Sequence, residues 1–360
     1  MADPAPAQQP ADALELRQRP GQDPGRLPAG PAVTGRLSLG VLGCSAIARR
    51  RTIPALDSLG NVRLAAVASR SAEKAERFAA TFGAEPCGYA ELIERPDVDA
   101  VYLSLPNRLH HEWARRALLA GKHVLCEKPL TGDPATTKDL IDLAAERGLV
   151  LRENFAFLHH PQHARVRELM AAGRLGAVRT LSVAFTIPPL PSDDIRYDAA
   201  LGGGSLLDLG VYPLRLAWLL FGDGLSVAGA ALRVDERLGV DVAGQAMLVS
   251  RGGVFVDLRF GFQHSYRCRY EVWGSTASLS LDRAFTPPPD HRPAVVVEEQ
   301  DHDERFFLPP AHQFRLSVSS FADAALRGAV ASEEQGWLTG ALETARLVED
   351  VRTAAAGHLA

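Results

Sequence analysis

A lysine and a tyrosine in this sequence could act together on a proton. Lys128 lies in a Glu-Lys-Pro triplet directly after an apolar run, and Tyr212 lies four residues after Asp208. Lysine and tyrosine have ordinary pKa values of about 10.4 and about 10. An ammonium group can stabilise negative charge that develops on an oxygen, and a phenol can donate a proton to that oxygen. A nearby ammonium group should also lower the pKa of the tyrosine.

Structural alternatives for these residues remain open. Lys128 could form a salt bridge with Glu127 at the end of a strand, and Tyr212 could be a core residue of a helix. Residues four apart share one face of a helix, so Asp208 would be an orienting or substrate-binding group beside Tyr212. The glycines at 202–204 could form a flexible loop, or they could let a ligand approach the start of the next helix.

A glycine-containing turn after the first apolar run predicts a dinucleotide-binding site. Gly43, Ser45 and Ala48, which Gly40 precedes, have the spacing of the Gly-x-Gly-x-x-Gly/Ala fingerprint, with serine in place of the second glycine. The serine hydroxyl could bond a phosphate oxygen, and the N-terminus of the following helix offers free N–H groups to an anion. The alternative is a tight turn with no ligand.

The end of the second apolar run favours NADP(H) over NAD(H). An NAD site usually has Asp or Glu there for the ribose hydroxyls, but this chain has Ser69, Arg70 and Ser71, with Lys74 one turn later. A guanidinium can bind a 2′-phosphate through two hydrogen bonds. The alternative is a solvated surface arginine. The cofactor site is expected to comprise Gly43, Cys44, Ser45, Ala46, Ile47, Ser69, Arg70, Lys74, Leu105, Pro106, Asn107, His110, Glu127 and Lys128.

Strands and helices must alternate to bring these segments together. Short apolar runs typical of buried strands lie at 37–43, 63–69, 100–105, 123–128 and 149–155. Helices are predicted between them: Ser71 caps one that Gly83 ends, Asn107 caps the next, and Asp133 caps another that Gly148 ends. The alternation predicts an α/β Rossmann domain with a parallel, doubly wound sheet, which binds ligands at the carboxyl ends of its strands.

The second half of the chain has a different periodicity. Apolar residues alternate over 181–187, and paired runs at 245–250 with 254–260 and at 267–273 with 277–281 are separated by glycine-containing turns. This pattern predicts an open, mostly antiparallel sheet in an α+β domain, with one face free for a ligand or a second subunit. We expect a Rossmann domain at 37–157 and a substrate and oligomerisation domain at 158–360, with the last helix packing back on the body.

Composition excludes several classes of function. A chain of 360 residues suits about two domains. Its net charge of −4 shows no basic excess for nucleic acid or anionic membranes, and no apolar run approaches the roughly 18 residues of a membrane span. The four scattered cysteines predict neither a zinc site nor a disulfide framework, and the adjacent pair His159-His160 predicts no metal site. A cytoplasmic protein is expected.

The first 36 residues form a separate segment rich in proline and alanine. Such a segment cannot bury enough apolar surface to offset the entropy of ordering, so a disordered tail is predicted. The alternative is a short arm that binds a partner.

Together these motifs resemble those of the Gfo/Idh/MocA oxidoreductase family over almost everything after residue 36. The resemblance rests on Glu127-Lys128-Pro129, Glu153-Asn154-Phe155, Gly202-Gly203-Gly204 and Asp208-x-Gly210-x-Tyr212. It implies hydride transfer between NADP(H) and a CH–OH or C=O group. Reduction of a ketone leaves an alkoxide, so Tyr212 is expected to donate the proton and Lys128 to stabilise the charge. Many members carry histidine at the position of Tyr212. Members with tyrosine include sugar ketoreductases and dihydrodiol or xylose dehydrogenases, so the Asp/His arrangement of inositol dehydrogenases is disfavoured.

Further stretches resemble one subset of the family, the NADPH-dependent C-3 ketoreductases that act on dTDP-linked keto-deoxysugars in deoxysugar and antibiotic biosynthesis. These stretches are 159–162, 194–197, 210–213, 262–269, 283–287 and 312–314. The resemblance implies a nucleotide-sugar substrate, with Asn154, Asp208, Tyr197 and Arg196 as binding residues. Tyr266, Arg267 and Arg269 are further candidates for nucleotide contacts. The alternative for the arginines is solvated surface or a subunit contact.

Two other functions remain open. An NADP-dependent aldose or trans-dihydrodiol dehydrogenase would keep the same lysine and tyrosine, whereas a free sugar would need fewer cations than a nucleotide sugar. A non-catalytic regulator that senses a dinucleotide would need neither side chain. In each case a homodimer or homotetramer is expected from the open sheet.

Overall fold

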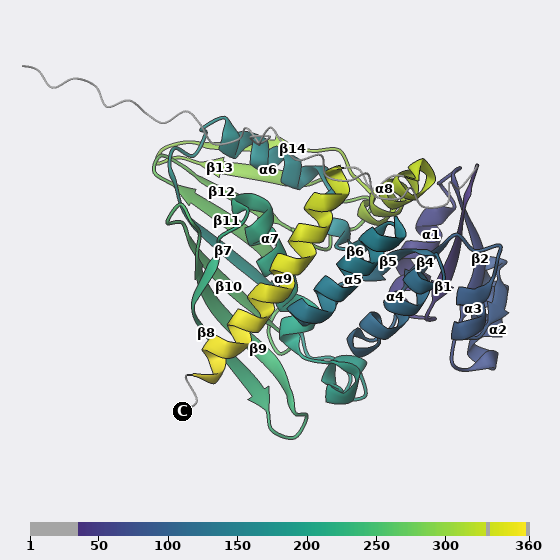
Figure 1. Cartoon of the computed structure of the whole chain (residues 1–360). Coiled ribbons are helices and arrows are strands. Elements are labelled where there is room, and N and C mark those ends of the chain that lie inside the picture. Colours follow the sequence, from purple (N-terminus) through teal and green to yellow (C-terminus); the bar gives the residue numbers. More distant parts are fainter. Residues whose placement is uncertain (1–34, 329–331, 358–360) are drawn as a thin grey trace, which may run out of the picture.

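The computed structural model describes residues 35–328 and 332–357, so all but the last two residues of the predicted tail lie outside the described part. Two sheets lie side by side, and helices cover the faces that point toward each other (Figure 1). The first sheet carries the glycine-containing turn, and the second is the larger.

The first sheet is parallel and has the strand order β3-β2-β1-β4-β5-β6. Its strands are β1 (Leu37–Leu42), β2 (Val62–Ala68), β3 (Glu85–Cys87), β4 (Ala100–Leu103), β5 (His123–Glu127) and β6 (Leu151–Asn154). All six residues of β1 are buried, as expected for a strand covered on both faces. The order reverses between β1 and β4, which is where doubly wound sheets bind dinucleotides. The three-residue strand β3 lies at the edge and was too short to predict from an apolar run.

Helices cover both faces of this sheet, in keeping with the predicted alternation. They are the π-helical turn η1 (Ala48–Thr52), α1 (Ile53–Leu56), α2 (Ala72–Phe82), α3 (Tyr89–Glu94), α4 (His110–Leu119) and α5 (Pro134–Arg147). Two predicted caps are confirmed: Ser71 accepts a hydrogen bond from the Lys74 N–H, and Asp133 accepts one from the Thr136 N–H.

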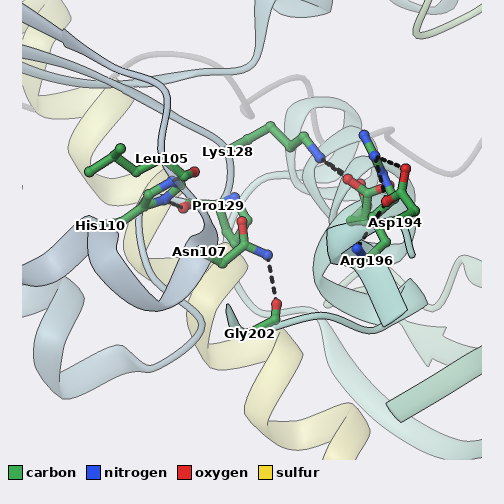
Figure 2. A network of polar contacts seen from close by, with 9 residues as sticks. Leu105, Asn107, His110, Lys128, Pro129, Asp194, Arg196 and Gly202 are labelled. Carbon is green, nitrogen blue, oxygen red and sulfur yellow. Dashed lines mark hydrogen bonds and ion pairs between the residues drawn. The ribbon is translucent and has the colours of Figure 1, made fainter. Parts of the chain in front are cut away.

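The predicted cap at Asn107 is wrong. This residue begins the short 3₁₀ turn η2 (Asn107–Leu109), and α4 begins only at His110. The Asn107 side chain donates instead to the carbonyl oxygen of Gly202, at 3.0 Å (Figure 2). The Asn107 side chain therefore bonds a distant segment instead of the helix that the local sequence predicted it to cap.

The second sheet has eight strands in the order β14-β13-β12-β11-β7-β10-β9-β8, and only the β7–β10 pair among them is parallel. The strands are β7 (Val178–Thr186), β8 (Ser226–Asp235), β9 (Val240–Val249), β10 (Phe255–Gly261), β11 (Arg267–Gly274), β12 (Ser278–Asp282), β13 (Ala294–Glu298) and β14 (Asp303–Phe307). The alternation predicted for β7 is confirmed, because Leu181, Val183 and Phe185 are buried. The pairings β9–β10 and β11–β12 also follow the prediction, whereas β8, β13 and β14 were not predicted.

Helices on the inner face of the second sheet join the two halves. They include α6 (Pro161–Ala171), the π-helical turn η6 (Leu206–Gly210) and α7 (Val211–Phe221). The long helix α9 (Ser332–Ala356), yellow in Figure 1, contacts α5 and β6 on one side and α7 and β8 on the other. Helix α8 (Gln313–Arg327) was not predicted. It buries Val318 and Phe321 against β1, so it packs on the first sheet although its sequence follows the second.

One helical stretch corrects the expectation about apolar segments. Residues 199–221 form a stretch of 23 residues with a mean hydropathy of 1.2, long and apolar enough by these measures to cross a membrane. Of its most apolar window, 67% is buried inside the molecule. Its apolar composition is therefore accounted for by packing in the core.

Candidate active site

A cleft of about 940 Å³ lies between the two sheets. The carboxyl ends of the parallel strands line one side of it, and Phe185 of β7, Asp208 and Tyr212 line the other. The structure brings together on this cleft most of the residues predicted for the cofactor: Gly43, Cys44, Ser45, Ala46, Ile47, Arg70, Lys74, Leu105, Pro106, Asn107, Glu127 and Lys128. Of the predicted substrate-binding residues, Asn154, Arg196 and Asp208 also line it.

The glycine-containing turn fits a dinucleotide. Gly43 has φ +109°, and a Cβ there would lie 2.6 Å from the carbonyl oxygen of Ser104. Only glycine can therefore let β1 approach β4 this closely at the floor of the cleft. The Ser45 hydroxyl accepts a hydrogen bond from the Ala48 N–H at 3.1 Å, which leaves the hydroxyl proton free to donate to a phosphate oxygen.

The end of β2 offers unpaired positive charge. Arg70 and Lys74 both line the cleft, and neither forms an ion pair with a carboxylate in the part of the chain that the structure describes. Tyr89, which the sequence analysis missed, lines the cleft beside them. Burial raises the pKa of Tyr89, and the charge of Arg70, together with hydrogen bonding to it, opposes that rise. These groups fit a 2′-phosphate at the adenosine end of NADP(H).

Ser69 does not line the cleft, contrary to its predicted place in the cofactor site. Its side chain is off the cleft and accepts a hydrogen bond from the Ser71 N–H at 3.3 Å. Because the Ser69 side chain does not line the cleft, it is not placed to meet a phosphate there as predicted.

Lys128 is held by Asp208 rather than by Glu127. Its Nζ donates to the Asp208 carboxylate and to the Asp208 carbonyl oxygen, both at 2.8 Å. The other carboxylate oxygen of Asp208 accepts from the Nε of Arg196 at 2.7 Å, and Arg196 also pairs with Asp194 (Figure 2). Burial alone would raise the pKa of Asp208, but Lys128 and Arg196 lower it to about 2. Asp208 therefore stays ionised and fixes the ammonium group at the cleft.

Glu127 has different partners. It accepts from the Tyr102 hydroxyl at 2.6 Å and from the Asn154 amide at 2.7 Å. Burial raises the pKa of Glu127, while these hydrogen bonds and the charge of Lys128 oppose the rise. The salt bridge that was an alternative reading of Lys128 does not form.

His110 is a structural residue, contrary to its predicted place in the cofactor site. It is fully buried, and its ring nitrogens lie 2.7 Å from the carbonyl oxygen of Pro129 and 2.8 Å from that of Leu105 (Figure 2). The ring thus ties the end of β4 to the cis Lys128-Pro129 turn at the end of β5. It positions two segments of the cleft wall without reaching the cleft itself.

Tyr212 presents its hydroxyl from an aromatic cage. Its ring contacts the rings of Phe155, Phe157, Phe185 and Phe285, with centroids 5.1 to 5.8 Å away. The residue lines the cleft, and its hydroxyl forms no hydrogen bond with any residue that the structure describes. It is therefore free to bond a ligand.

The expected lowering of the pKa of Tyr212 is wrong. Burial raises this pKa well above its ordinary value of 10, and the carboxylates of Glu127 and Asp208 raise it further. The Lys128 ammonium lies over the face of the ring, 5.1 Å from its centroid, and Asp208 already compensates its charge. Tyr212 is thus a neutral phenol at physiological pH, which is the form that donates a proton.

The glycines at 202–204 serve close packing. A Cβ on Gly203 would lie 2.5 Å from the carbonyl oxygen of Arg196, and one on Gly204, where φ is +113°, would lie 2.4 Å from the Asp241 carboxylate. The Ser205 hydroxyl donates to the same carboxylate. The glycine run therefore seats η6 against β9 and the 194–198 segment, and it is more than a flexible loop.

Tyr197 is a further correction. It is buried and does not line the cleft; its hydroxyl accepts from the Leu190 N–H at 3.1 Å, and its ring packs on Phe262. Nor do Tyr266, Arg267 and Arg269 line the cleft.

The lining residues that sequence reasoning did not assign include Arg50, Arg51, Phe157, Phe285, Gln313 and Phe314. Several of them stand in the stretches that carried the family resemblance, which is the signal that could have found them.

The chain is similar to known proteins over most of its length. Residues 37–155 match an oxidoreductase family with an NAD-binding Rossmann fold, and residues 163–280 match the GFO/IDH/MocA C-terminal domain. Two proteins called dTDP-3,4-didehydro-2,6-dideoxy-alpha-D-glucose 3-reductase are similar over 326 residues. The one from Streptomyces violaceoruber is 51% identical, covering 89% of this chain and 95% of that protein. The one from Actinomadura kijaniata is 49% identical, covering 90% and 97%.

A solved structure has the same fold. It is that of KijD10, a 3-ketoreductase from Actinomadura kijaniata, in complex with NADP and TDP-benzene. The TM-score is 0.86 at 48% sequence identity, and the match covers 89% of this chain and 98% of KijD10.

Proposed function

This chain belongs to the Gfo/Idh/MocA oxidoreductase family, and from that membership we propose that it uses NADPH to reduce the C-3 ketone of a dTDP-linked keto-deoxysugar. The observation that carries the proposal is the Lys128 ammonium over the ring of Tyr212, whose hydroxyl has no partner among the described residues, in a cleft that reaches the dinucleotide turn. The relatives' 3-reductase names and the complex of KijD10 with NADP and TDP-benzene support this substrate class. The reaction belongs to deoxysugar biosynthesis, including that of antibiotics.

The chain's own residues prepare the ketone for reduction. NADPH, when bound along Gly43–Ile47 and Arg70, supplies the hydride. Lys128 donates two hydrogen bonds to Asp208. An ammonium group has three N–H donors, so one remains for the ketone oxygen. As negative charge develops on that oxygen, the ammonium group stabilises it. Tyr212 gives its proton to the oxygen, which completes the alcohol, and the tyrosinate then takes a proton from water.

Asp208 and Arg196 act through Lys128. Both oxygens of the Asp208 carboxylate are occupied, one by Lys128 and the other by Arg196. The guanidinium is itself balanced by Asp194. We therefore propose Asp208 and Arg196 as positioning residues, with Asn154, which holds Glu127, as a third. For Asp208 this is the orienting role that the sequence analysis gave as one alternative; for Arg196 and Asn154 we propose it in place of the substrate contact that was expected.

Product analysis with a nucleotide-sugar ketone tests this function. The 3-keto substrate can be generated in the assay by dehydration of a dTDP-sugar at C-2 and C-3, and the product sugar examined by NMR. We expect one NADPH oxidised per sugar reduced at C-3, with dTDP as a competitive inhibitor. Oxidation of free aldoses or diols with comparable kcat/KM and no inhibition by dTDP would instead identify an aldose or dihydrodiol dehydrogenase. Absence of turnover with any of these substrates would favour the dinucleotide-sensing regulator.

Removal of the Arg70 guanidinium should discriminate between the two nicotinamide cofactors. We expect Arg70→Ala to raise the Kd for NADPH by about 10- to 100-fold, because a charge-assisted pair with the 2′-phosphate is lost. The Kd for NADH should change less than about threefold, since NADH has no such phosphate. Fluorescence titration measures both constants, with the exposed Arg305→Ala as the matched control. Equal losses for the two cofactors would contradict the 2′-phosphate assignment.

We propose a homo-oligomer in the cytoplasm, formed by the outer face of the second sheet. Phe255 of β10 and Trp273 of β11 are both about half exposed on this face. Each is paired with Thr180 of β7, so the three residues form one row across three neighbouring strands. Met247 lies one row away on the same face and is also half exposed. Paired charges of both signs, such as Arg259 with Asp257, border these residues. A second copy offers the same apolar row with complementary charges.

The oligomer prediction is tested by charge insertion. Trp273→Glu should convert the assembly to a smaller species, because a carboxylate would be buried without a partner at the contact. Light scattering after size exclusion measures the mass, and Leu119→Glu, an exposed leucine on α4, is the control. A mass equal to one chain for the unsubstituted protein, or no change in Trp273→Glu, would rule out this surface.

A further inference from the structure

The cleft holds more positive charge than the cofactor and the catalytic pair require. Six cationic side chains line it: Arg50, Arg51, Arg70, Lys74, Lys128 and Arg196. Lys128 and Arg196 are balanced by acidic side chains. The other four form no ion pair with any residue that the structure describes. All four are exposed at the cleft, where an unpaired cation attracts an anionic ligand.

Three of the four unpaired cations lie toward the cofactor. Arg70 and Lys74 stand at the end of β2. Arg50 lines the main cleft and also a second cavity of about 410 Å³, which Lys74, Cys44 and Ser45 share. Arg51 does not line this second cavity. It is therefore the cation in the cleft that remains for a different anion.

Arg51 lies beside the N-terminus of α8. The turn η1, which carries Arg51, packs against α8, and the charge of Arg51 is one of the causes that lower the pKa of His312, after burial and Arg315. His312 caps this 15-residue helix by accepting a hydrogen bond from the Arg315 N–H. The N–H groups of Gln313 and Phe314 form no hydrogen bond within the described residues. Arg51, Gln313 and Phe314 all line the cleft, so free N–H groups of a helix N-terminus and a guanidinium occur together there, which favours an anion.

A buried amide at the same place also lacks a partner. The Gln313 side chain lines the cleft although it is only 4% exposed, and its Nε2 donates to the carbonyl oxygen of Phe285 at 3.1 Å. Its Oε1 is buried and accepts no hydrogen bond from any described residue. An unsatisfied buried acceptor destabilises a protein unless a ligand or water supplies the donor. An N–H or O–H group of a ligand would satisfy it.

We propose that the diphosphate of the nucleotide-sugar substrate binds between Arg51 and the first turn of α8, and that Gln313 accepts a hydrogen bond from the nucleoside part of the same ligand. This inference rests on the proposed function and specifies how the nucleotide is recognised. Helix α8 and η1 both pack on the first sheet. The nucleotide is therefore held by the half of the molecule that binds NADPH, while the sugar ring reaches Tyr212 on the other half.

The two neighbouring arginines make a matched pair for the test. Calorimetric titration of the unsubstituted enzyme, Arg51→Gln and Arg50→Gln with dTDP, thymidine and NADPH gives nine affinities. We expect Arg51→Gln to raise the Kd for dTDP by about 10- to 100-fold, since a charge-assisted contact to phosphate is lost. Its Kd values for thymidine and NADPH should change less than about threefold. Arg50→Gln should weaken NADPH more than dTDP.

The possible outcomes separate this inference from the proposed function. If Arg51→Gln weakens NADPH while dTDP is unaffected, or weakens both equally, Arg51 serves the cofactor and the inference is wrong. If it weakens neither, no phosphate binds there and the inference is again wrong. If the unsubstituted enzyme binds NADPH but no dTDP, the nucleotide-sugar substrate itself is excluded and both proposals fail. Arg51→Lys supplies a further check, because a restored charge should recover part of the dTDP affinity without altering NADPH binding.

Discussion

Replacing Tyr212 by phenylalanine is expected to lower kcat for ketone reduction by about 10²- to 10⁴-fold, the range that general acid catalysis contributes. Only the hydroxyl is removed, and the aromatic cage of Phe155, Phe157, Phe185 and Phe285 keeps the ring in place. The Kd for NADPH should therefore stay within about threefold of its normal value. Single-turnover measurement of NADPH oxidation, together with fluorescence titration of the cofactor, separates the two quantities.

Another buried tyrosine provides the control. Tyr270 is fully buried, and its hydroxyl lies 3.1 Å from the Nδ1 of His163, away from the cleft. Tyr270→Phe should cost about 1 kcal/mol of stability for the lost hydrogen bond while kcat remains nearly unchanged. If Tyr212→Phe had a kcat equal to that of Tyr270→Phe, another group would have to supply the proton.

The pH dependence follows from the same environment. Since burial and two carboxylates raise the pKa of Tyr212 above 10, the acid form persists across neutral pH. Reduction should therefore not lose rate through ionisation of Tyr212 between about pH 6 and pH 9. Oxidation of the alcohol needs the tyrosinate as a base, so its rate should rise with pH over the same interval. A reductive kcat that falls with an apparent pKa below about 9 and is absent in Tyr212→Phe would contradict the raised pKa.

Lys128→Ala should lower kcat at least as strongly, by about 10²- to 10⁴-fold, because it removes the cation aimed at the developing oxyanion. Two consequences combine here. The ketone oxygen loses its electrostatic partner, and the Asp208 carboxylate keeps only Arg196 as a cationic partner, so its negative charge at the cleft is less well compensated. Steady-state kinetics should show the loss in kcat and in kcat/KM alike.

The lysine prediction has its own controls. Lys138, an exposed residue paired with Asp142 on α5, can be replaced by alanine without affecting the cleft. The double variant Lys128→Ala/Tyr212→Phe should be little worse than either single variant, since groups that act on one proton transfer are not additive. Fully additive losses would show that the two residues serve independent steps.

The polar network around Lys128 joins the two halves of the molecule. Lys128 comes from the end of β5, whereas Asp208 comes from η6, 80 residues later. The Asn107 amide bonds the Gly202 carbonyl across the same boundary. Each contact joins the half of the molecule built on the first sheet to the half built on the second. The orientation of the Lys128 ammonium group therefore depends on how the two halves are packed. Variants that loosen this packing should lower kcat more than they weaken cofactor binding.

The sequence by itself determined the elements and the types of chemistry. Short apolar runs, caps such as Ser71 and Asp133, and the alternation in β7 are set by local periodicity and local hydrogen bonds, which a sequence records directly. The fingerprint around Gly43 and the lysine at the end of β5 follow from the same source. Motif spacing within one βα unit therefore predicted which side chains would meet at the carboxyl edge of the parallel sheet.

Only the tertiary structure decided partners and ionisation. The sequence could not tell that Lys128 pairs with Asp208 instead of Glu127, or that Asn107 bonds Gly202 instead of capping a helix. It also could not place Arg51 beside α8, since the two are separated by about 260 positions in the chain. The pKa of Tyr212 was predicted in the wrong direction because burial and the balance of nearby charges depend on every packed element around the ring. A sequence lists the groups, whereas the electrostatic environment of each group is set by contacts between segments that only folding brings together.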